Sequence, residues 1–289
     1  MKISGTTRVY ALIGDPIDHS LSPAIQNAAF KHLGLDYVYV VFKVEEGELK
    51  DAIAGVRGLG LHGMNVTMPH KTKVAKYLDK LDKTAKIIGS VNTILNDDGK
   101  LIGYTTDGKG ALNALKYNGV DPHNKKVMIL GAGGAARSVS LTLAEEVKEI
   151  VILNRTLEKA KQLVNDLFKV LRKKANARAE SLYAENTRKE LNDTDIIINA
   201  TSVGMRPNEN QTPIDPDFLH PRLVVFDLIY EPLETKLLRE ARRIGAKTID
   251  GLTMLVLQGA ISFEIWTGMK APIKVMMEAA KENLSDRTH

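Results

Sequence analysis

The sequence predicts an α/β protein whose middle forms a doubly wound parallel sheet, preceded by a second, less regular α/β region. Three observations predict it. Short apolar, β-branched runs alternate with stretches of helical spacing between residues 126 and 250. A glycine-rich turn follows the first of these runs, and after Gly251 the pattern becomes purely helical. Continuous apolar strands that alternate with helices are typical of a parallel sheet covered on both faces.

The first hundred residues alternate strands and helices less regularly. We expect strands at Val9–Ile13, Tyr37–Phe42, Gly63–Thr67, Val91–Leu95 and Leu101–Thr105, with a hairpin turn at Asp97-Asp98-Gly99. Helices are expected at Pro23–Leu33, Glu46–Val56 and Ala111–Asn118. Ser22 should cap the first helix with its hydroxyl, because a proline suited to the first helical position follows it.

The middle of the chain has the clearest rhythm. We expect strands at Val127–Leu130, Ile150–Leu153, Ile196–Ile198, Val224–Phe226 and Lys247–Ile249, and a poorly patterned one at Ala177–Ala179. Helices are expected at Ala135–Val147, Leu157–Lys173 and Leu233–Ile244. Two more, Leu252–Trp266 and Ile273–Asn283, form a helical tail that should pack back onto the earlier domain.

The composition of the 289 residues excludes several classes of protein. Hydrophobic residues make up 44% and charged residues 26%, which excludes a disordered chain or a fibre. The absence of cysteine rules out disulfides, Cys-ligated zinc, iron–sulfur clusters and thiol nucleophiles. The chain has no signal-peptide pattern and no apolar run near the roughly 20 residues of a membrane span. We therefore expect a cytoplasmic protein with no membrane partner.

The net charge of +5 does not indicate a nucleic-acid partner. Nucleic-acid binders usually concentrate their basic residues on one face. Here the only tight clusters are Arg172-Lys173-Lys174 and Lys125-Lys126, which we interpret as a solvated helix end and a solvated strand entry. His19, His62 and His70 show no metal-ligand spacing, so no metal site is expected.

A glycine-rich turn, residues 131–136 with the sequence GAGGAA, lies between an apolar strand and a helix. This is the dinucleotide-binding fingerprint with alanine in its last position. Gly131 makes the tight turn, and Gly133 lets the backbone approach a pyrophosphate at the helix N-terminus. The alternative is a flexible strand-to-helix turn with no ligand.

The next strand ends in Asn154, Arg155 and Thr156, with no carboxylate to accept the ribose hydroxyls of NAD. Arg155 offers a planar fork for a phosphate, and Lys159 follows on the same side of the helix that Thr156 should cap. This favours the 2′-phosphate of NADP, although surface charges beside an ordinary helix cap would look the same. A polar loop with Thr201 and Ser202 leaves a later strand and should face the nicotinamide, unless it is only turn chemistry.

Four polar segments between residues 14 and 108 indicate a ligand site. They contain Ser20 and Ser22, then Asn65, Thr67 and Lys71, then Asn92, and finally Asp107. Asn65 and Thr67 alternate with apolar residues and should share a face. Lys71 follows Pro69, which should begin a helix, and would act as a general acid or base if it lay in a desolvated cleft. Plain helix capping remains the alternative for Ser22 and Asp107.

Nine segments in this order resemble the shikimate dehydrogenase family: GDPIDHSLSP, NVTMPHK, SVNT, GYTTDGKG, GAGGAA, NRT, NATSVGM, DLIYEP and GLTMLVLQGAISFEIWTG. The resemblance runs from Gly14 to Gly268. It implies NADP-dependent, reversible interconversion of 3-dehydroshikimate and shikimate in aromatic amino-acid biosynthesis, and a homodimer. It also implies a substrate-binding and catalytic domain of residues 1–106 and 251–289, and a Rossmann-type NADP-binding domain of residues 107–250.

The resemblance assigns roles by position. Shikimate binding falls to Ser20, Ser22, Asn65, Thr67, Lys71, Asn92, Asp107, Tyr230 and Gln258, with Lys71 and Asp107 as the catalytic pair. Pyrophosphate binding falls to Gly131, Ala132, Gly133, Gly134 and Ala135. Binding of the adenosine phosphate falls to Asn154, Arg155, Thr156 and Lys159, and Gly251 should lie near the nicotinamide. Relatives often carry arginine where Lys159 stands, so the preference for NADP should be softer here.

Two other functions fit the same residues. A dual quinate/shikimate dehydrogenase would have the same fold, although the lack of an acidic residue at positions 154 and 155 favours NADP and shikimate. A non-catalytic sensor that binds a dinucleotide and a metabolite would be expected to lose Lys71 and Asp107, and both are present.

Overall fold

The computed structural model describes residues 3–171 and 176–286. Contacts within the chain divide it into two compact units. The first unit contains the chain up to Thr106 and from Val256 onward, and the second contains Asp107–Leu255. The helix α9 (Gly251–Thr267) therefore begins in the second unit and ends in the first. No described helix is both long and apolar enough to cross a membrane.

The first unit is built on a mixed six-stranded sheet with the order β2-β1-β3-β5-β6-β4. Its strands are β1 (Arg8–Gly14), β2 (Tyr37–Lys43), β3 (Gly63–Val66), β4 (Lys80–Leu81), β5 (Thr93–Asp97) and β6 (Lys100–Tyr104). Its helices are α1 (Ser22–His32), α2 (Leu49–Gly58), α3 (Lys83–Ile88), α9 and α10 (Ile273–Asp286), with single 3₁₀ turns η1 (Glu46–Glu48) and η2 (Val74–Tyr77). Strand β1 pairs in parallel with β2 and β3, whereas β5 runs antiparallel to β3 and β6.

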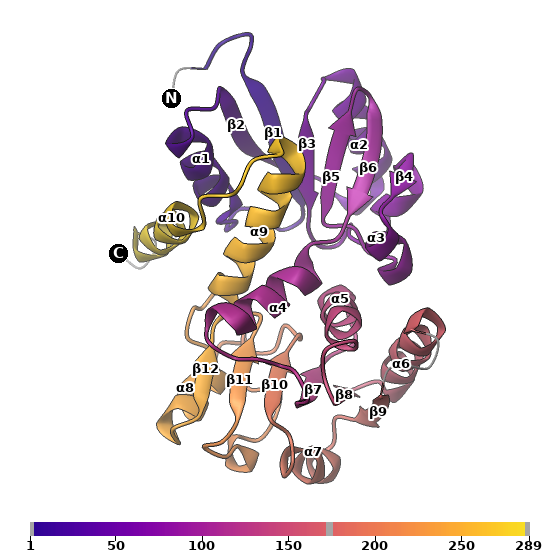
Figure 1. Cartoon of the computed structure of the whole chain (residues 1–289), viewed down its shortest axis with the longest axis vertical. Coiled ribbons are helices and arrows are strands. Elements are labelled where there is room, and N and C mark those ends of the chain that lie inside the picture. Colours follow the sequence, from indigo (N-terminus) through magenta and orange to yellow (C-terminus); the bar gives the residue numbers. More distant parts are fainter. Residues whose placement is uncertain (1–2, 172–175, 287–289) are drawn as a thin grey trace. The chain divides into compact units, whose positions relative to one another are not determined.

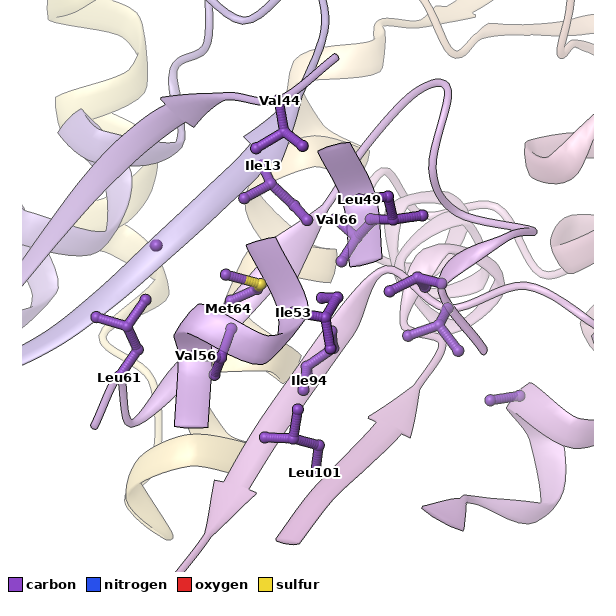
Figure 2. Close-up of a cluster of buried hydrophobic side chains, with 14 residues drawn as sticks. Ile13, Val44, Leu49, Ile53, Val56, Leu61, Met64, Val66, Ile94 and Leu101 are labelled. Carbon is purple, nitrogen blue, oxygen red and sulfur yellow. The ribbon is translucent and has the colours of Figure 1, made fainter. Parts of the chain in front are cut away.

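Successive residues of a strand point to opposite faces, and each face of this sheet has its own core. Figure 2 shows Ile13 of β1 and Met64 of β3 packed against Leu49, Ile53 and Val56 of α2. All five side chains are buried, so the apolar stripe of α2 is fully covered on this face.

The other face carries an aromatic core that packs α9 onto the sheet (Figure 1). The ring of Tyr10 lies 5.4 Å from that of Phe30 and 5.1 Å from that of Trp266, measured between centroids. Phe263, on the same helix as Trp266, lies 5.6 Å from Phe30. Position 63 in β3 requires glycine, because a Cβ there would collide with the Trp266 indole. The helical tail thus packs on the first unit's sheet, as the fold prediction required.

Several boundaries in the first unit differ from the sequence prediction. Ser22 is not the helix cap: it is the first residue of α1, Leu21 holds the cap position, and no side chain caps the helix there. The expected helix Glu46–Val56 is divided into η1 and α2. The short elements β4 and α3 were not expected, because six residues or fewer leave too little periodicity to detect.

The second unit is a doubly wound sheet of six parallel strands in the order β12-β11-β10-β7-β8-β9, which confirms the fold class. The strands are β7 (Lys126–Leu130), β8 (Glu149–Asn154), β9 (Ala177–Ser181), β10 (Ile196–Asn199), β11 (Val224–Asp227) and β12 (Lys247–Ile249). The helices are α4 (Asp107–Tyr117), α5 (Gly134–Leu143), α6 (Leu157–Leu171), α7 (Ala184–Leu191) and α8 (Lys236–Arg243), with η3 at Pro216–Phe218. Strand order reverses between β7 and β10, where such sheets bind ligands at the carboxyl ends of their strands.

Both faces of this parallel sheet are covered, which explains why its strands are continuous apolar runs. Met128, Val151, Ile197 and Val225 pack on one face with residues of α7 and α8. Helices α4, α5 and α6 lie on the other face (Figure 1).

The second unit also corrects parts of the prediction. The helix expected to reach Val147 ends at Leu143, and the one expected to start at Leu233 starts at Lys236. Helix α7 was not expected, because its eight residues are mostly polar. The cluster Arg172-Lys173-Lys174 lies outside the described residues.

Lys126 is not a solvated strand entry, because only 7% of its side chain is exposed. Its Nζ lies 2.9 Å from Oε2 of Glu190 and also contacts Asp193. Arg178 binds the same Glu190 carboxylate and reaches Glu149 at 2.7 Å. A buried lysine is tolerated here because carboxylates compensate its charge.

Candidate active site

A network of buried amide and hydroxyl side chains occupies the first unit, and Asn65 on β3 is at its centre. The two N–H groups of Asn65 Nδ2 have three acceptors within hydrogen-bond distance: the Asn92 carbonyl at 3.0 Å, Thr93 Oγ1 at 3.2 Å and Ser262 Oγ at 3.1 Å. Its Oδ1 accepts a hydrogen bond from the Tyr39 hydroxyl at 2.8 Å. The amide of Asn65 is therefore held in one orientation by its neighbours.

Asn92 extends this network toward α9. Its Nδ2 donates to Thr106 Oγ1 at 2.8 Å and to Gln258 Oε1 at 3.0 Å, and its Oδ1 accepts from the Thr106 backbone N–H at 2.8 Å. The structure thus brings Asn65, Asn92 and Gln258 together, although they are far apart in the sequence. Ser262 belongs to the same cluster, and its spacing of four residues from Gln258 on one helix was the signal that sequence reasoning missed.

The two serines at the start of α1, Ser20 in the preceding loop and Ser22 as its first residue, reach this network through Tyr39. Burial raises the pKa of Tyr39 well above its usual range, and a hydrogen bond with Ser22 opposes the rise. Ser20 and Ser22 are half-buried, and Ser20 Oγ accepts from the Ser22 backbone N–H at 3.2 Å. Tyr39, which the sequence did not single out, therefore links Ser22 to Asn65.

Lys71 lies in a tight turn after β3. The helix expected to start at Pro69 does not form there, and the backbone makes successive turns instead. The His70 N–H donates to the Thr67 carbonyl at 3.0 Å, and the N–H groups of Lys73 and Val74 donate to the His70 carbonyl. The Lys71 carbonyl accepts from the Val91 backbone N–H at 2.8 Å. These bonds fix the backbone of Lys71, whose side chain is half-buried, and Thr67 is half-buried beside it.

Asp107, the other expected catalytic residue, begins α4 in the second unit and is only 4% exposed. The next residue, Gly108, donates its N–H to Ser138 Oγ at 2.8 Å. A Cβ on Gly108 would collide with Ser138 and Thr142, so the glycine lets α4 approach α5 closely. Asp107 is thereby fixed within its unit, and its pairing with Lys71 stays a prediction.

The glycine-rich turn between β7 and α5 has the form that a dinucleotide requires. Gly131 has a φ of 105°, which residues with a side chain rarely adopt, and a Cβ there would crowd the Ala200 carbonyl oxygen at 3.1 Å. Gly133 is different: nothing lies within 4 Å of a Cβ built there, and its φ is −82°. No packing within the described chain requires a glycine at that position. Open space beside a helix start without a side-chain cap fits a bound pyrophosphate.

The rest of the fingerprint lies around the same turn and at the tip of β8. Ala132, Gly134 and Ala135 are half-buried. Arg155, Thr156 and Lys159 are exposed, and Asn154 Nδ2 donates to the Thr156 carbonyl at 2.9 Å. Within the described chain, neither Arg155 nor Lys159 is engaged in an ion pair. These two exposed cations are therefore open to an external anion, such as a phosphate.

The carboxyl ends of β10 and β11 carry a second buried polar cluster. Asn199 Oδ1 accepts from Thr201 N–H at 3.0 Å and from Thr201 Oγ1 at 2.7 Å, so turn chemistry accounts for the position of Thr201. Ser202 is exposed. Asp227, which the sequence did not single out, accepts from Asn199 Nδ2 at 3.0 Å, and burial raises its pKa to about 6.

Tyr230 and Gly251 follow from these same strands. Tyr230 is half-buried in the loop after β11. Gly251 donates its N–H to the Ile229 carbonyl at 3.2 Å, and a Cβ on it would collide with the carbonyl oxygen of Leu228. The glycine at the start of α9 is therefore required by the loop that carries Tyr230.

Three family models match successive parts of the chain. They describe a shikimate dehydrogenase substrate binding domain over residues 12–94, a shikimate/quinate 5-dehydrogenase over residues 113–212, and a shikimate 5'-dehydrogenase C-terminal domain over residues 251–281. The shikimate dehydrogenase (NADP(+)) of Methanopyrus kandleri is 48% identical over 287 residues, which cover 98% of each chain.

Solved structures agree with these relatives. A shikimate dehydrogenase in complex with NADP+ is 47% identical, with a TM-score of 0.92 and 98% of each chain covered. The shikimate 5-dehydrogenase of Listeria monocytogenes, in complex with shikimate and NAD, is 43% identical with a TM-score of 0.87, covering 96% of this chain and 98% of that one. Since these similarities extend over nearly the whole chain, the protein belongs to the shikimate dehydrogenase family.

Proposed function

We propose that this chain catalyses the reversible, NADPH-dependent reduction of 3-dehydroshikimate to shikimate in aromatic amino-acid biosynthesis. The observation that carries the proposal is the buried network of Asn65, Asn92 and Gln258 in the unit that matches a substrate binding domain. Amide groups both donate and accept hydrogen bonds, so they suit the several hydroxyls of shikimate. Because the orientation of these amides is fixed, they suit a substrate whose hydroxyl groups lie at particular positions.

Residues of both units contribute to substrate binding in this proposal. The substrate-binding set is Ser20, Ser22, Asn65, Thr67, Lys71, Asn92, Asp107, Tyr230 and Gln258. Residues 1–106 and 251–289 form the substrate-binding domain in this proposal, and residues 107–250 form the NADP-binding domain. Lys71 and Asp107 act as a hydrogen-bonded pair that moves a proton at the reacting oxygen of the substrate.

The cofactor is held along the carboxyl edge of the parallel sheet. Residues Gly131, Ala132, Gly133, Gly134 and Ala135 hold the pyrophosphate, and Asn154, Arg155, Thr156 and Lys159 hold the adenosine phosphate. Thr201, Ser202 and Gly251 face the nicotinamide. When bound, NADPH supplies the hydride that reduces the substrate carbonyl. The protein supplies binding, orientation and the proton.

A direct assay tests the activity. The purified chain is offered shikimate or quinate with NADP+ or NAD+, and the absorbance of the reduced nicotinamide is followed. Fastest turnover with shikimate and NADP+ supports the proposal. Equal rates with quinate would identify the dual dehydrogenase instead. Binding without turnover for every pairing would identify the non-catalytic sensor.

Lys71→Ala tests the catalytic role. We expect kcat to fall about 10²- to 10⁴-fold, as for loss of a general acid or base, and to fall far more than KM for shikimate rises. Lys73→Ala is the matched control, because Lys73 lies in the same turn, is exposed and pairs with Glu46 on the surface. A rise in KM alone for Lys71→Ala would show that Lys71 only binds the substrate and has no catalytic role.

The homodimer and the cytoplasmic location stay predictions from the resemblance and the sequence. Sedimentation velocity at several protein concentrations measures the oligomeric state directly. A single monomeric species at micromolar concentration would contradict the homodimer without affecting the proposed reaction.

A further inference from the structure

Asp227 is a buried carboxylate to which the reaction described above gives no role. It is the last residue of β11, is fully buried, and lies in register with Asn199, the last residue of β10. Both residues therefore stand at the carboxyl edge of the parallel sheet, where such folds place their ligands.

The carboxylate of Asp227 holds three separate segments of the chain. Its Oδ1 accepts from Asn199 Nδ2 at 3.0 Å and from the Ile229 backbone N–H at 3.1 Å. Its Oδ2 accepts from Thr235 Oγ1 at 2.7 Å, and Thr235 caps α8 by accepting from the Leu238 backbone N–H. The loop after β10, the loop after β11 and the start of α8 thus meet on one side chain.

These segments carry residues that face the cofactor and the substrate. Asn199, held by Asp227, in turn holds the loop after β10. Its Oδ1 accepts two hydrogen bonds from Thr201, and its Nδ2 also donates to the Val203 carbonyl at 3.3 Å. On the other side, Ile229 accepts from the Gly251 backbone N–H at 3.2 Å and directly precedes Tyr230. One carboxylate therefore restrains the surroundings of Thr201, Tyr230 and Gly251 together.

The three donors to Asp227 are neutral: a side-chain amide, a backbone N–H and a hydroxyl. A buried carboxylate bonded to neutral groups alone is costly to a fold. Glu190 shows the contrast within the same unit, because Lys126 and Arg178 compensate its charge. A contribution to stability therefore does not explain the presence of an acid at position 227. Its ability to hold three hydrogen-bond donors at once is the better explanation.

We propose that Asp227 is a positioning residue for hydride transfer, which holds the loops bearing Thr201 and Tyr230 in the geometry that the nicotinamide and substrate require. The inference rests on the proposed function. It makes Asp227 act through other residues, without contact with cofactor or substrate.

Asp227→Ala and Asp227→Asn separate this role from a structural one. The alanine variant removes all three hydrogen bonds, whereas asparagine keeps an oxygen for Asn199 and Ile229. We expect Asp227→Ala to lower kcat about 100-fold, the usual effect of misplacing reacting groups by about 1 Å. The affinity for NADP+, measured by calorimetry, should change little because Arg155 and Lys159 are untouched. Asp227→Asn should recover most of kcat.

Amide hydrogen exchange of the unliganded protein gives a readout that is independent of activity. In Asp227→Ala, exchange should accelerate in residues 199–203 and 228–235 and stay unchanged in β7 and β8. Glu190→Gln is the control for a general loss of stability, and it should leave kcat unchanged. Thr235→Val removes one bond to the carboxylate in a milder variant, and it should shift kcat and exchange in the same direction by less.

Wild-type kcat and protected exchange in both Asp227→Ala and Thr235→Val would overturn the inference. If Asp227→Ala does not fold, the comparison of Thr235→Val with Thr235→Ser tests the inference instead. Equal kcat and equal hydrogen exchange in these two variants would overturn the inference. An inactive wild-type chain contradicts the proposed function itself, whereas an active wild type with unaffected variants contradicts only the role of Asp227.

Discussion

Replacing Glu190 by glutamine should destabilise the protein, because this carboxylate compensates the buried Lys126 and the half-buried Arg178. The Glu190 side chain is only 6% exposed. Its Oε1 accepts from Arg178 Nη1 at 2.7 Å and its Oε2 from Lys126 Nζ at 2.9 Å. Glu190→Gln keeps the shape of the side chain and removes the charge. Lys126 is then left with Asp193, whose side chain is largely exposed.

The structure gives the size of this effect and its dependence on pH. The hydrogen bond from Arg178, followed by that from Lys126, lowers the pKa of Glu190 from 4.5 to about 2. A pKa lowered by folding means that the stabilisation is fully present above pH 4.5 and is lost as the pH falls toward 2. The difference corresponds to about 3 kcal/mol at pH 7 and about 2 kcal/mol at pH 3.5. Loss of one partner of a buried pair commonly costs about this much.

Urea unfolding followed by far-UV circular dichroism measures the effect at the two pH values. Glu180→Gln is the matched control, because Glu180 approaches the same Arg178 at 3.6 Å but is 37% exposed. An exposed pair of this kind contributes about 0–1 kcal/mol. Equal losses of stability in Glu180→Gln and Glu190→Gln would refute the reasoning, and so would a loss in Glu190→Gln that does not shrink at pH 3.5.

Three further predictions concern the sheet's carboxyl edge. Gly131→Ala should lower stability by about 1–3 kcal/mol and weaken NADP+ binding, because a φ of 105° strains any other residue; calorimetric titration with NADP+ checks this. Arg155→Ala should lower kcat/KM with NADPH about 10- to 100-fold and leave that with NADH unchanged, as loss of a charged hydrogen bond predicts; parallel losses with both cofactors would contradict it. Burial raises the pKa of Asp227 from 3.8 to about 6, so its contribution to stability is greatest below pH 3.8 and is lost as the pH rises through 6. Asp227→Asn should therefore gain up to about 3 kcal/mol relative to wild type between pH 4 and 7, and a pH-independent difference in urea unfolding would contradict this.

The doubly wound sheet was predictable because its strands and turns carry unmistakable local signals. The run Ile196–Ile198 has no polar residue, and Gly131 follows directly after an equally apolar strand. Such short apolar runs, alternating with helices, are typical of buried parallel strands. Boundaries were less predictable: Ser22 and Pro23 fit an N-cap pattern, yet the helix starts at Ser22 itself. The exact first residue of a helix depends on contacts with neighbouring parts of the backbone, and the local sequence does not reveal those contacts.

The candidate site was predictable residue by residue but not as a network. Asn65 and Asn92 stand out because they are polar residues within apolar segments. Tyr39 does not, because a tyrosine in a β-rich run reads as ordinary core. Its bonds to Asn65 and Ser22 depend on which strand lies beside which, and the sheet order β2-β1-β3 is a tertiary fact.

Two of the buried acids of the second unit, Glu190 and Asp227, show how one parallel sheet separates stability from function. Lys126 and Glu149 begin β7 and β8, so the ion cluster around Glu190 stands at the amino ends of the strands. Asp227 and Asn199 end β11 and β10, at the carboxyl ends. The acid at the amino ends is fully compensated by cations and stabilises the fold at neutral pH. The acid at the carboxyl ends has neutral partners and destabilises it when ionised, as its raised pKa shows. A cost of that kind is expected where a side chain must fix loops around a ligand. Glu190→Gln should therefore change stability without changing kcat, whereas Asp227→Ala, which removes all three hydrogen bonds, should lower kcat.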